Sequence, residues 1–493
     1  MNSKYIMSGL MITMLGAPVA VQAAEFAPSS VRALGMGGSS VASTHGVDAS
    51  YWNPAAYGFF GEESSESDNN QMGDKDFGVE LGIGVGANVF GPLDANRLKL
   101  EALPDPSGLT GTGLSATQIQ TAAAVVDGIS SLDTAPMGAN IFVNGMIGAR
   151  VSNYGIGVRT AIDLNNTITI DNVNVGFNDI FASFTAPGTI PLATIPPASI
   201  NYFSQAQADA LAASLVASDP SLTIDKANAV VIAYDAALFA DPAAAGQQQQ
   251  NIDAMNTIAA ASGTDLANNN TALSLRGVAI SEVGFTYGHA INENLSVGGV
   301  LKIIQADIIA FDSQIFASNT STTFDQNNAE TSTDFGLDLG VMYRIPSWQV
   351  GLTIKNINTP SFEHSGAGTF ANTPYVYEMK PQAKFGAAWI PLDTVTVELG
   401  YDLTENEGAV ASTKSQYWNF GAEWNAWNVL ALRLGAFENM SQDIGLVTTA
   451  GLGLNLWAAR IDLGVAVSSK EIDFDGERVP VYLAAALALA VDF

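Results

Sequence analysis

Apolar and polar residues alternate with a period of two along most of this chain. In the segment 394–404, apolar side chains share one face, while Thr396, Glu398, Gly400 and Asp402 fall on the other. Alternation over about ten residues is the strand pattern of a membrane barrel, whose outer face meets lipid and whose lumen is polar. A soluble β-sandwich shows the same alternation, so the pattern alone leaves both architectures open.

The number of such segments favours the barrel. About fourteen can be counted, an even number, as bacterial single-chain barrels require. They lie near 77–90, 138–151, 154–166, 274–290, 294–311, 332–345, 348–358, 378–390, 394–404, 415–426, 428–439, 445–456, 459–470 and 481–492.

The connections between these segments are alternately short and long. Tight turns fall at 153–154, 292–294, 346–347, 391–393 and 426–427, and long links at 91–137, 167–273, 312–331 and 359–377. Short periplasmic turns opposite long outer loops produce this rhythm. The large aromatics Tyr343, Trp348, Trp389, Trp424, Trp427 and Trp457 lie beside short turns, as expected at a membrane–water boundary. We therefore predict an all-β fold, a transmembrane antiparallel β-barrel of about 14 strands over 77–493.

The N-terminus predicts export. Lys4 is followed by the apolar region 6–15, and Val21, Gln22 and Ala23 suit a cleavage site. The alternative is that this region forms a buried first helix of the folded protein. The apolar region is too short to remain as a membrane-spanning anchor. We expect a cleaved signal peptide at 1–23 and a location in the outer membrane of a Gram-negative cell.

The residue patterns in two of the long links predict helices. Ser115 can cap a helix over 115–132, and the alanine-rich segments 205–217, 223–240 and 251–267 are separated by Asp-Pro breakers. The polar tract Gln247–Gln250 is interpreted as an exposed joint. The helical insertion, 168–273, is too long for a simple loop. It is either a cap above the barrel or a plug dipping into it, and the sequence leaves this choice open.

Composition narrows the functional classes. The chain has 493 residues, a net charge of −29 and no cysteine. Such a charge repels nucleic-acid phosphates, so we expect no nucleic-acid partner. The absence of cysteine excludes thiolate nucleophiles and disulfides. His45, His289 and His364 lack metal-ligand spacing, no nucleotide or serine-hydrolase motif occurs, and the glycines of 82–86 fit a strand. We expect neither an enzyme nor a bound cofactor or metal.

A glycine-rich segment follows the signal peptide. It runs from Arg32 through Gly35, Gly37 and Gly38 to Trp52-Asn53-Pro54-Ala55. Here the chain resembles the FadL-like long-chain fatty-acid transporter superfamily and, more narrowly, the TraF-like outer-membrane proteins with a conjugal-transfer label. Segments resembling that narrower family recur at 355–362, 381–382, 402–404, 421–424 and 433–435.

The resemblance implies a fourteen-stranded barrel blocked by an N-terminal hatch. We assign the hatch to 24–60 and an acidic linker to 61–76. Its expected gate residues are Gly35, Gly37, Gly38, Asn53, Pro54 and Ala55. Glycines permit tight turns in a crowded lumen, and Asn and Pro stabilise turns. From physics alone both motifs could be ordinary turns.

Charged residues recur on the predicted inward faces. They are Arg159, Asp163, Lys302, Asp338, Lys355, Lys384, Glu398, Asp402, Glu423, Arg433, Arg460 and Asp462. Their mixed signs indicate ion pairs across the lumen, and a ligand site is the alternative. Fatty-acid transporters set a basic residue against the ligand carboxylate, but the loops here differ too much to assign it to a position.

Two functional hypotheses follow from the resemblance. The first is a plugged channel for small hydrophobic compounds. The second is a structural or interaction protein of the envelope associated with conjugal transfer. The expected partners are outer-membrane lipid and lipopolysaccharide, with a small hydrophobic ligand or an envelope protein in addition.

Overall fold

The computed structural model describes residues 30–59, 77–105, 109, 115–177, 193–218, 222–261, 264–316, 329–366, 374–407, 414–427, 429–456, 458–474 and 477–492. The expected signal peptide, the acidic linker and Trp457 lie outside these residues. Within the described part of the chain, no helix combines the length and the hydropathy needed to cross a membrane.

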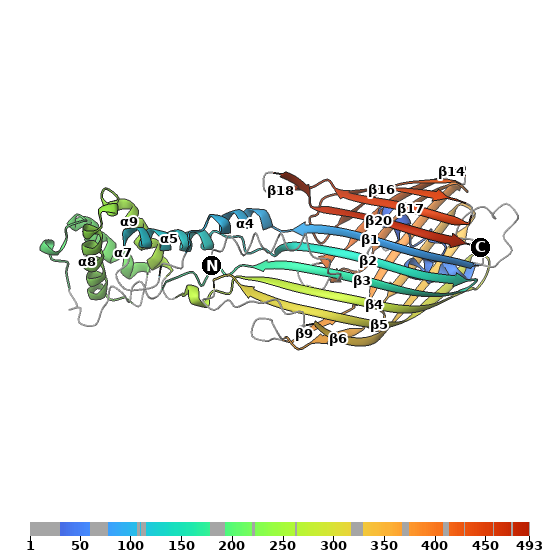
Figure 1. Ribbon diagram of the computed structural model, residues 1–493, viewed down its shortest axis with the longest axis horizontal. Helices are drawn as coiled ribbons and strands as arrows, with labels where there is room; N and C mark the ends of the chain where they lie inside the picture. The colour runs from blue at the N-terminus through green and yellow to red at the C-terminus, as the bar shows by residue number, and fades with distance from the viewer. Residues whose placement is uncertain are drawn as a thin grey trace.

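Fourteen of the described strands close into one antiparallel barrel, which confirms the predicted fourteen-stranded architecture (Figure 1). Pairing of the first strand with the last completes the cylinder, with Gly78 opposite Asp492. The strands are β1 (Phe77–Phe90), β2 (Met137–Val151), β3 (Tyr154–Thr169), β4 (Ala272–Ala290), β5 (Leu295–Gln314), β6 (Ala329–Ile345), β7 (Trp348–Lys355), β10 (Gln382–Leu392), β11 (Val395–Asp402), β14 (Tyr417–Ala426), β15 (Leu430–Asn439), β16 (Val447–Asn455), β17 (Ala459–Ser468) and β20 (Tyr482–Asp492).

The outer surface of the barrel is an apolar belt. Large aliphatic and aromatic side chains are exposed there on every strand; Leu434, for example, is 67% exposed and Phe335 58%. Trp348, Trp389 and Trp424 are also about half exposed, beside the short turns. A contiguous apolar surface of this kind is unfavourable in water, whereas lipid stabilises it and tryptophan marks its edge.

The barrel wall is taller on one side. The strands β4, β5 and β6 have 19, 20 and 17 residues, whereas β7 and β11 have eight each. All short turns lie at one end of the cylinder and all long connections at the other (Figure 1). The tall side therefore extends toward the long loops.

Three short hairpins occupy the long-loop end, none of which the sequence pattern predicted. They are β8–β9 (Ser361–His364 and Tyr375–Glu378), β12–β13 (Asn406–Glu407 and Lys414–Ser415) and β18–β19 (Glu471–Phe474 and Glu477–Pro480). The predicted strand 348–358 was too long and the predicted start at 378 too early. The reason is that Asn356 and Thr359 adopt φ of 53° and turn the chain into the β8–β9 hairpin.

The β8–β9 hairpin covers the inner face of the tall wall. Its Phe362 and Tyr377 join a buried apolar cluster with Ile280, Ile304 and Ile308 of β4 and β5. Backbone amides of the segment bond to β6 carboxylates, as Ser361 does to Asp334 at 2.9 Å. This part of the lumen is thus apolar, unlike the part that holds the hatch.

A helical head projects from the long-loop end of the barrel (Figure 1). It comprises α4 (Leu93–Ala102), α5 (Ala116–Ser130), α7 (Gln205–Ser218), α8 (Ile224–Ala240) and α9 (Gln248–Ala260), with short 3₁₀ turns η3 (Pro197–Ser199), η4 (Pro242–Ala244) and η5 (Leu266–Asn268). Helices α7, α8 and α9 lie away from the cylinder, so of the two arrangements left open by the sequence the outer one is present.

The boundaries of the head helices can be compared with the boundaries predicted from the sequence. Ser115 caps α5 in a capping box with Gln118, as its position predicted. The assignment of Gln247–Gln250 to a joint was wrong, because Gln248 begins α9. Polar glutamines are good helix formers, and the backbone carbonyl of Gln247 accepts from Asn251 at 3.0 Å. Helix α4 was also not predicted.

The head has its own apolar core, built from α5, α7, α8 and α9. Within it the carboxylate of Asp235 is fully buried. It accepts backbone N–H bonds from Asn201, Tyr202 and Phe203 at 2.7, 3.0 and 2.8 Å. Buried backbone amides require such partners, so Asp235 fixes the segment that leads into α7.

The segment of residues 30–59 lies inside the barrel at the short-turn end (Figure 1). It contains α2 (Val31–Gly35), α3 (Ala49–Trp52) and the 3₁₀ helix η1 (Pro54–Phe59). Residues 30–59 are called the hatch below. Nearly all of its residues are buried.

Candidate functional site

The first half of the hatch is anchored by a buried arginine. Ser30 caps α2 by accepting from the amide of Ala33. One turn of helix then directs Arg32 at Glu423 on β14, with Nε 3.0 Å from Oε2 and Nη2 3.1 Å from Oε1. The Arg32 Nη1 also donates to the carbonyl of Ser43 at 3.1 Å. This single side chain therefore ties the hatch both to the wall and to itself.

The Arg32–Glu423 pair continues into the wall as a chain of ion pairs. Glu423 also accepts from Arg433 at 2.5 Å, and Arg433 reaches Asp462 at 2.6 Å. Asp462 accepts from Arg460 at 2.5 Å, and Arg460 approaches Glu80 on β1 at 3.8 Å. Three cations face three anions, so burial leaves no uncompensated charge.

Glycine makes this chain possible on β16. Arg433 and Asp462 belong to β15 and β17, with β16 between them. A Cβ on Gly453 would lie 2.5 Å from the Asp462 carboxylate and 3.1 Å from the Arg433 guanidinium. Any larger residue would block the path, so the glycine lets an ion pair cross a strand.

A second anchor is the carboxylate of Glu398 on β11. It accepts from the backbone amides of Ala42 and Ser43 at 2.9 and 3.0 Å, and from the Ser43 hydroxyl at 2.5 Å. Two consecutive amides on one carboxylate fix the backbone more firmly than a side-chain contact alone.

His45 of the hatch is buried close to Arg32. Burial of the imidazole is the main cause, and the positive charge of Arg32 the second, of a His45 pKa well below its usual range. His45 is therefore neutral at pH 7.

Glycine lines the wall at ten positions where the hatch packs against it. An added Cβ at any of these positions would lie 3.0 Å or less from a hatch atom; at Gly298 it would be 2.3 Å from the carbonyl oxygen of Pro54. At most of these positions the nearest hatch atom belongs to the backbone, so the two backbones approach as closely as only glycine permits. The wall positions concerned are Gly148, Gly155, Gly288, Gly298, Gly340, Gly351, Gly386, Gly421, Gly435 and Gly451.

The expected gate residues all lie in this interface. Gly35 meets Gly451, while Gly37 and Gly38 have φ of 65° and 82°. The Asn53 amide donates to the carbonyls of Val41 and Val341 at 3.0 and 3.1 Å. Pro54 and Ala55 begin η1, and the Ala55 carbonyl accepts from Ser296 at 2.6 Å.

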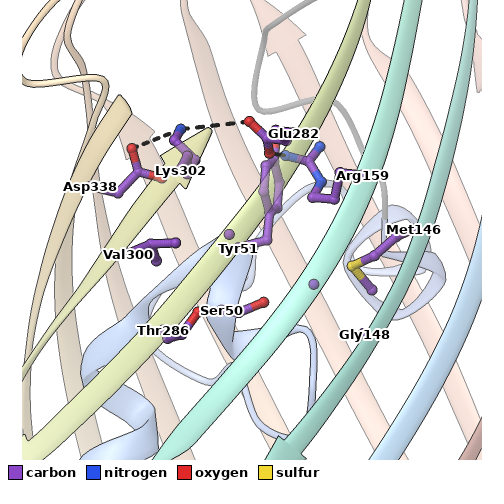
Figure 2. A pocket seen from close by; sticks show the side chains of 12 residues that line it. Ser50, Tyr51, Met146, Gly148, Arg159, Glu282, Thr286, Val300, Lys302 and Asp338 are labelled. Carbon is purple, nitrogen blue, oxygen red and sulfur yellow. Dashed lines mark hydrogen bonds and ion pairs between the residues drawn. The ribbon is translucent and has the colours of Figure 1, made fainter. Parts of the chain in front are cut away.

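A second charged cluster surrounds Tyr51 of α3 (Figure 2). The ring centroid lies 3.6 Å from the Arg159 guanidinium carbon and 2.8 Å from the Lys355 ammonium. Arg159 pairs with Glu282 at 2.6 Å, and Lys302 lies 2.9 Å from Asp338 and 3.7 Å from Glu282. The elements β3, β4, β5, β6 and β7 thus converge on one hatch side chain.

A small cavity of about 30 Å³ adjoins Tyr51. It is lined by Ser50 and Tyr51 of the hatch, by Met146, Val300 and small residues of β2, β3 and β4, and by the charged residues Arg159, Glu282, Lys302 and Asp338 (Figure 2). This volume holds one or two water molecules. In the state observed the hatch leaves no room here for a larger compound.

The predicted lumen charges are distributed over these clusters. Each of the twelve points inward. Glu423, Arg433, Arg460 and Asp462 form the first cluster, and Arg159, Lys302, Asp338 and Lys355 the second. Lys384 pairs with Asp402 at 3.1 Å beside Trp52. Glu398 belongs to neither cluster and binds the hatch directly. Asp163 stands apart, accepting from Asn165 at 2.7 Å near the β8–β9 hairpin.

Sequence reasoning missed several anchoring residues. Arg32 stood in the quoted motif but was not chosen, although it is the sole lysine or arginine between 30 and 59. Glu80 and Glu282 follow the same inward parity as the chosen charges. Tyr51 carried no signal of its own, because nothing in its sequence position distinguishes it from a tyrosine that only packs in a core.

In this arrangement the hatch occupies the lumen at the short-turn end of the barrel. Every contact between hatch and wall described above is noncovalent. Among the described residues, no group of three or more His, Asp or Glu side chains could hold a metal ion.

One known protein family matches part of the chain. The family described as "F plasmid transfer operon, TraF, protein" matches residues 201–402. Over this stretch the chain matches the TraF family. The match begins in the head, just before α7, and ends at the last residue of β11. The TraF-like resemblance recognised from the sequence is confirmed there. No curated protein matches the chain in sequence.

Several solved barrels are similar to the chain at low identity. The Ralstonia pickettii toluene transporter TbuX has 12% identity and a TM-score of 0.46, covering 95% of this chain and 100% of its own. The Pseudomonas putida toluene transporter TodX has 11% and 0.43, covering 94% and 98%. A Pseudomonas aeruginosa FadL homologue has 9% and 0.43, covering 96% and 100%.

Proposed function

We propose that this chain is a hatch-gated outer-membrane channel for small hydrophobic compounds. The observation that carries the proposal is the closed barrel with an apolar belt outside and, inside, a separate segment held only by noncovalent contacts. A barrel that never conducts would need no separate plug, whereas a segment that can move within the lumen could open and close a channel. In this proposal the hatch is the gate and lipid surrounds the barrel.

The proposal includes the route of export and the ligand class. The signal peptide at 1–23 is cleaved, and the mature barrel inserts with its short turns toward the periplasm. The ligands are small and hydrophobic, because the inner face of β4 and β5 under the β8–β9 hairpin is apolar. Lipopolysaccharide slows the passage of such compounds across the outer leaflet, so a channel would accelerate their entry.

Uptake by cells tests this function. Initial uptake rates of a panel of radiolabelled hydrophobic compounds are compared between a deletion strain and the same strain producing the chain. We expect the chain to accelerate at least one member of the panel several-fold. Equal rates for every compound, with the barrel folded and abundant in the outer membrane, would reject the proposal.

A second candidate is an envelope interaction role in conjugal transfer. It is favoured by the TraF match, which includes α7, α8 and α9 of the head. The head has a core of its own beyond the barrel end, and a channel has no evident need for it. Mating efficiency of a strain lacking only residues 193–261 tests this candidate. Unchanged mating would remove it without affecting the uptake proposal.

A further inference from the structure

One asparagine interrupts a row of small and apolar residues on the inner wall of the barrel. The neighbouring strands β20, β1, β2, β3 and β4 (Figure 1) place Ala486, Gly84, Asn144, Ala161 and Ile280 side by side in register. All five are buried, whereas their chain neighbours on β1 and β20 are exposed on the outer surface. Because side chains alternate across a strand, the row faces the lumen. Asn144 is its one member with a hydrogen-bonding side chain.

The side-chain amide of Asn144 is buried without a partner. Asn144 is 1% exposed. Within the part of the chain that the structure describes, neither its Oδ1 nor its Nδ2 has a hydrogen-bond partner. Buried polar groups are almost always hydrogen-bonded, because an unmade bond costs the desolvation of the donor and the acceptor. One acceptor and one donor group therefore remain for a ligand.

The wall on both sides of Asn144 suits an apolar ligand tail. On β1 and β20 the inward residues at this level and the next are glycine and alanine, which project little into the lumen; they are Gly82, Gly84, Ala486 and Ala488. On the other side, Ala161 and Ile280 belong to the buried apolar cluster that includes Val278. Methylene groups in contact with either side are removed from water. The row thus combines one polar group with apolar surface around it.

The charges near Asn144 favour a neutral ligand group. Arg159 and Asp163 lie on β3 two residues to either side of Ala161, the register partner of Asn144. Arg159 is paired with Glu282 at 2.6 Å, and Asp163 accepts from Asn165 at 2.7 Å. An ionised group at Asn144 would therefore bring a charge without a counter-charge of its own, and burying such a charge is costly. A hydroxyl or an amide needs only hydrogen bonds.

We propose that Asn144 binds the neutral polar group of a small amphiphile, a hydroxyl or an amide carried on a saturated apolar tail. The ligand group donates to Oδ1 and accepts from Nδ2, and the tail packs against the neighbouring glycines, alanines and Ile280. The proposal rests on the proposed channel function in assigning the ligand to the passing compounds. It deepens that function by setting neutral amphiphiles above hydrocarbons and above ionised amphiphiles.

Binding of matched ligands to the folded, detergent-solubilised chain tests the site. Hexan-1-ol and heptane are similar in size and shape, but only the alcohol forms hydrogen bonds. Equilibrium dialysis of the radiolabelled compounds gives the preference for hexan-1-ol over heptane, with protein-free micelles as background. Asn144→Leu keeps the shape of the side chain and removes both polar groups. Asn140→Leu is the matched control, because Asn140 lies on the same face of β2 but already donates to Asn165 at 3.0 Å.

We expect Asn144→Leu to lower the preference for hexan-1-ol at least about tenfold, as the loss of a hydrogen bond to a buried group implies. Asn140→Leu should leave the preference unchanged. An unchanged preference in Asn144→Leu would overturn the proposal, and so would the absence of hexan-1-ol binding by the unaltered chain. Heat-modifiable migration verifies folding, and Asn144→Ala replaces Asn144→Leu if the latter does not fold.

A charged substitution tests where the polar group of the ligand lies. Hexanoate has the same tail as hexan-1-ol but is ionised at pH 7, so we expect the unaltered chain to bind it more weakly than the alcohol. Asn144→Lys supplies a counter-charge and should tighten hexanoate binding at least about tenfold. Asn140→Lys should not. Equal hexanoate binding by the two lysine variants would place the polar group away from Asn144 and overturn the proposal.

These binding results and the uptake result can fail separately. Binding of hexan-1-ol that depends on Asn144, without accelerated uptake of any compound by cells, would reject the channel and leave the site. Accelerated uptake of hydrocarbons, together with an unchanged preference in Asn144→Leu, would leave the channel and reject the site.

Discussion

Arg32 of the hatch and Glu423 of β14 form a two-point buried ion pair, with nitrogen–oxygen distances of 3.0 and 3.1 Å. Glu423 also serves Arg433 at 2.5 Å, so its loss would leave two buried guanidinium groups short of a counter-charge. Breaking a buried pair from one side costs about 3–5 kcal/mol. In the proposed gate, movement of the hatch would carry Arg32 away from the wall.

Glu423→Gln should therefore open the channel more often without unfolding the barrel. Single-channel recording in planar bilayers is expected to show open events at least tenfold more frequent than in the unaltered chain. Glu405→Gln is the control, because the Glu405–Lys414 pair is more than 40% exposed and such pairs contribute little. Equal opening in both variants would show that Arg32 does not hold the hatch.

The glycine-lined wall gives a steric prediction. Gly298→Ala places a methyl group 2.3 Å from the Pro54 carbonyl oxygen, whereas Gly157→Ala meets nothing closer than 3.8 Å. We expect the first variant to displace η1 and increase leakage of a small sugar from proteoliposomes, and the second to resemble the unaltered chain. If both variants leak equally, the tight approach of hatch and wall is not what seals the lumen.

The apolar belt gives a prediction about insertion. Leu434 lies near the middle of β15 and is 67% exposed, and Leu392 ends β10 beside a short turn with 62% exposed. Arginine at the bilayer centre costs about 2–4 kcal/mol, and near the interface about 0–1 kcal/mol. Urea titration of folding into vesicles should thus show a larger loss for Leu434→Arg than for Leu392→Arg. The reverse order would move the membrane boundaries.

The head should unfold separately when Asp235 is altered. Asp235→Ala leaves three backbone amides without their acceptor, at about 1–3 kcal/mol for each buried group. We expect faster cleavage of α7 and α8 by trypsin-like and chymotrypsin-like proteases, with heat-modifiable migration of the barrel retained. Asp253→Ala, on the exposed side of α9, is the matched control. Loss of the folded barrel would refute the independence of the head.

Acid should loosen the junction between β3 and the head. Partial burial raises the pKa of Asp171, but bonds from Asn174, Asn270 and Val173 outweigh this effect and lower the pKa to about 2. A lowered folded-state pKa stabilises the fold above the unfolded value near 4. This contribution is lost as pH falls from about 4 to 2. Hydrogen exchange of the amides at 173 and 270 should therefore rise over that range, after correction for intrinsic rates. Asp171→Asn should remove this extra rise, and a rise of equal size in both proteins would contradict the assignment.

The fold was predictable where local pattern decides structure. Alternation located the barrel strands because a lumen and a lipid face impose opposite polarity on neighbouring residues, as Glu398 and Leu399 show. The β8–β9 hairpin was not predicted, because four-residue strands carry too little periodicity. Helix α4 was not predicted because it is only ten residues long and mixes apolar with charged residues.

The site was predictable only in part, for a reason of geometry. Inward parity selected Glu423, Arg433 and Asp462, but parity does not reveal which side chains meet. The Arg433–Asp462 pair depends on Gly453 two residues from the register partner of Arg433. The contacts of Arg32 and Tyr51 depend on how the hatch enters the lumen, which no local pattern encodes.

Locking the hatch to the wall tests the central claim most directly. A Cβ at Gly400 of β11 would lie 3.7 Å from the hydroxyl oxygen of Ser39 in the hatch and would meet no other residue's atom closer than 3.4 Å. The pair Ser39→Cys and Gly400→Cys therefore brings two thiols near each other without a steric clash, in a chain without native cysteine. Uptake of the radiolabelled hydrophobic compound that the unaltered chain accelerates most is measured in cells producing the double variant, in the oxidised and reduced states, with each single variant as control. The account predicts that oxidation abolishes the accelerated uptake and that reduction restores it. Undiminished uptake with the disulfide fully formed would contradict gating by the hatch.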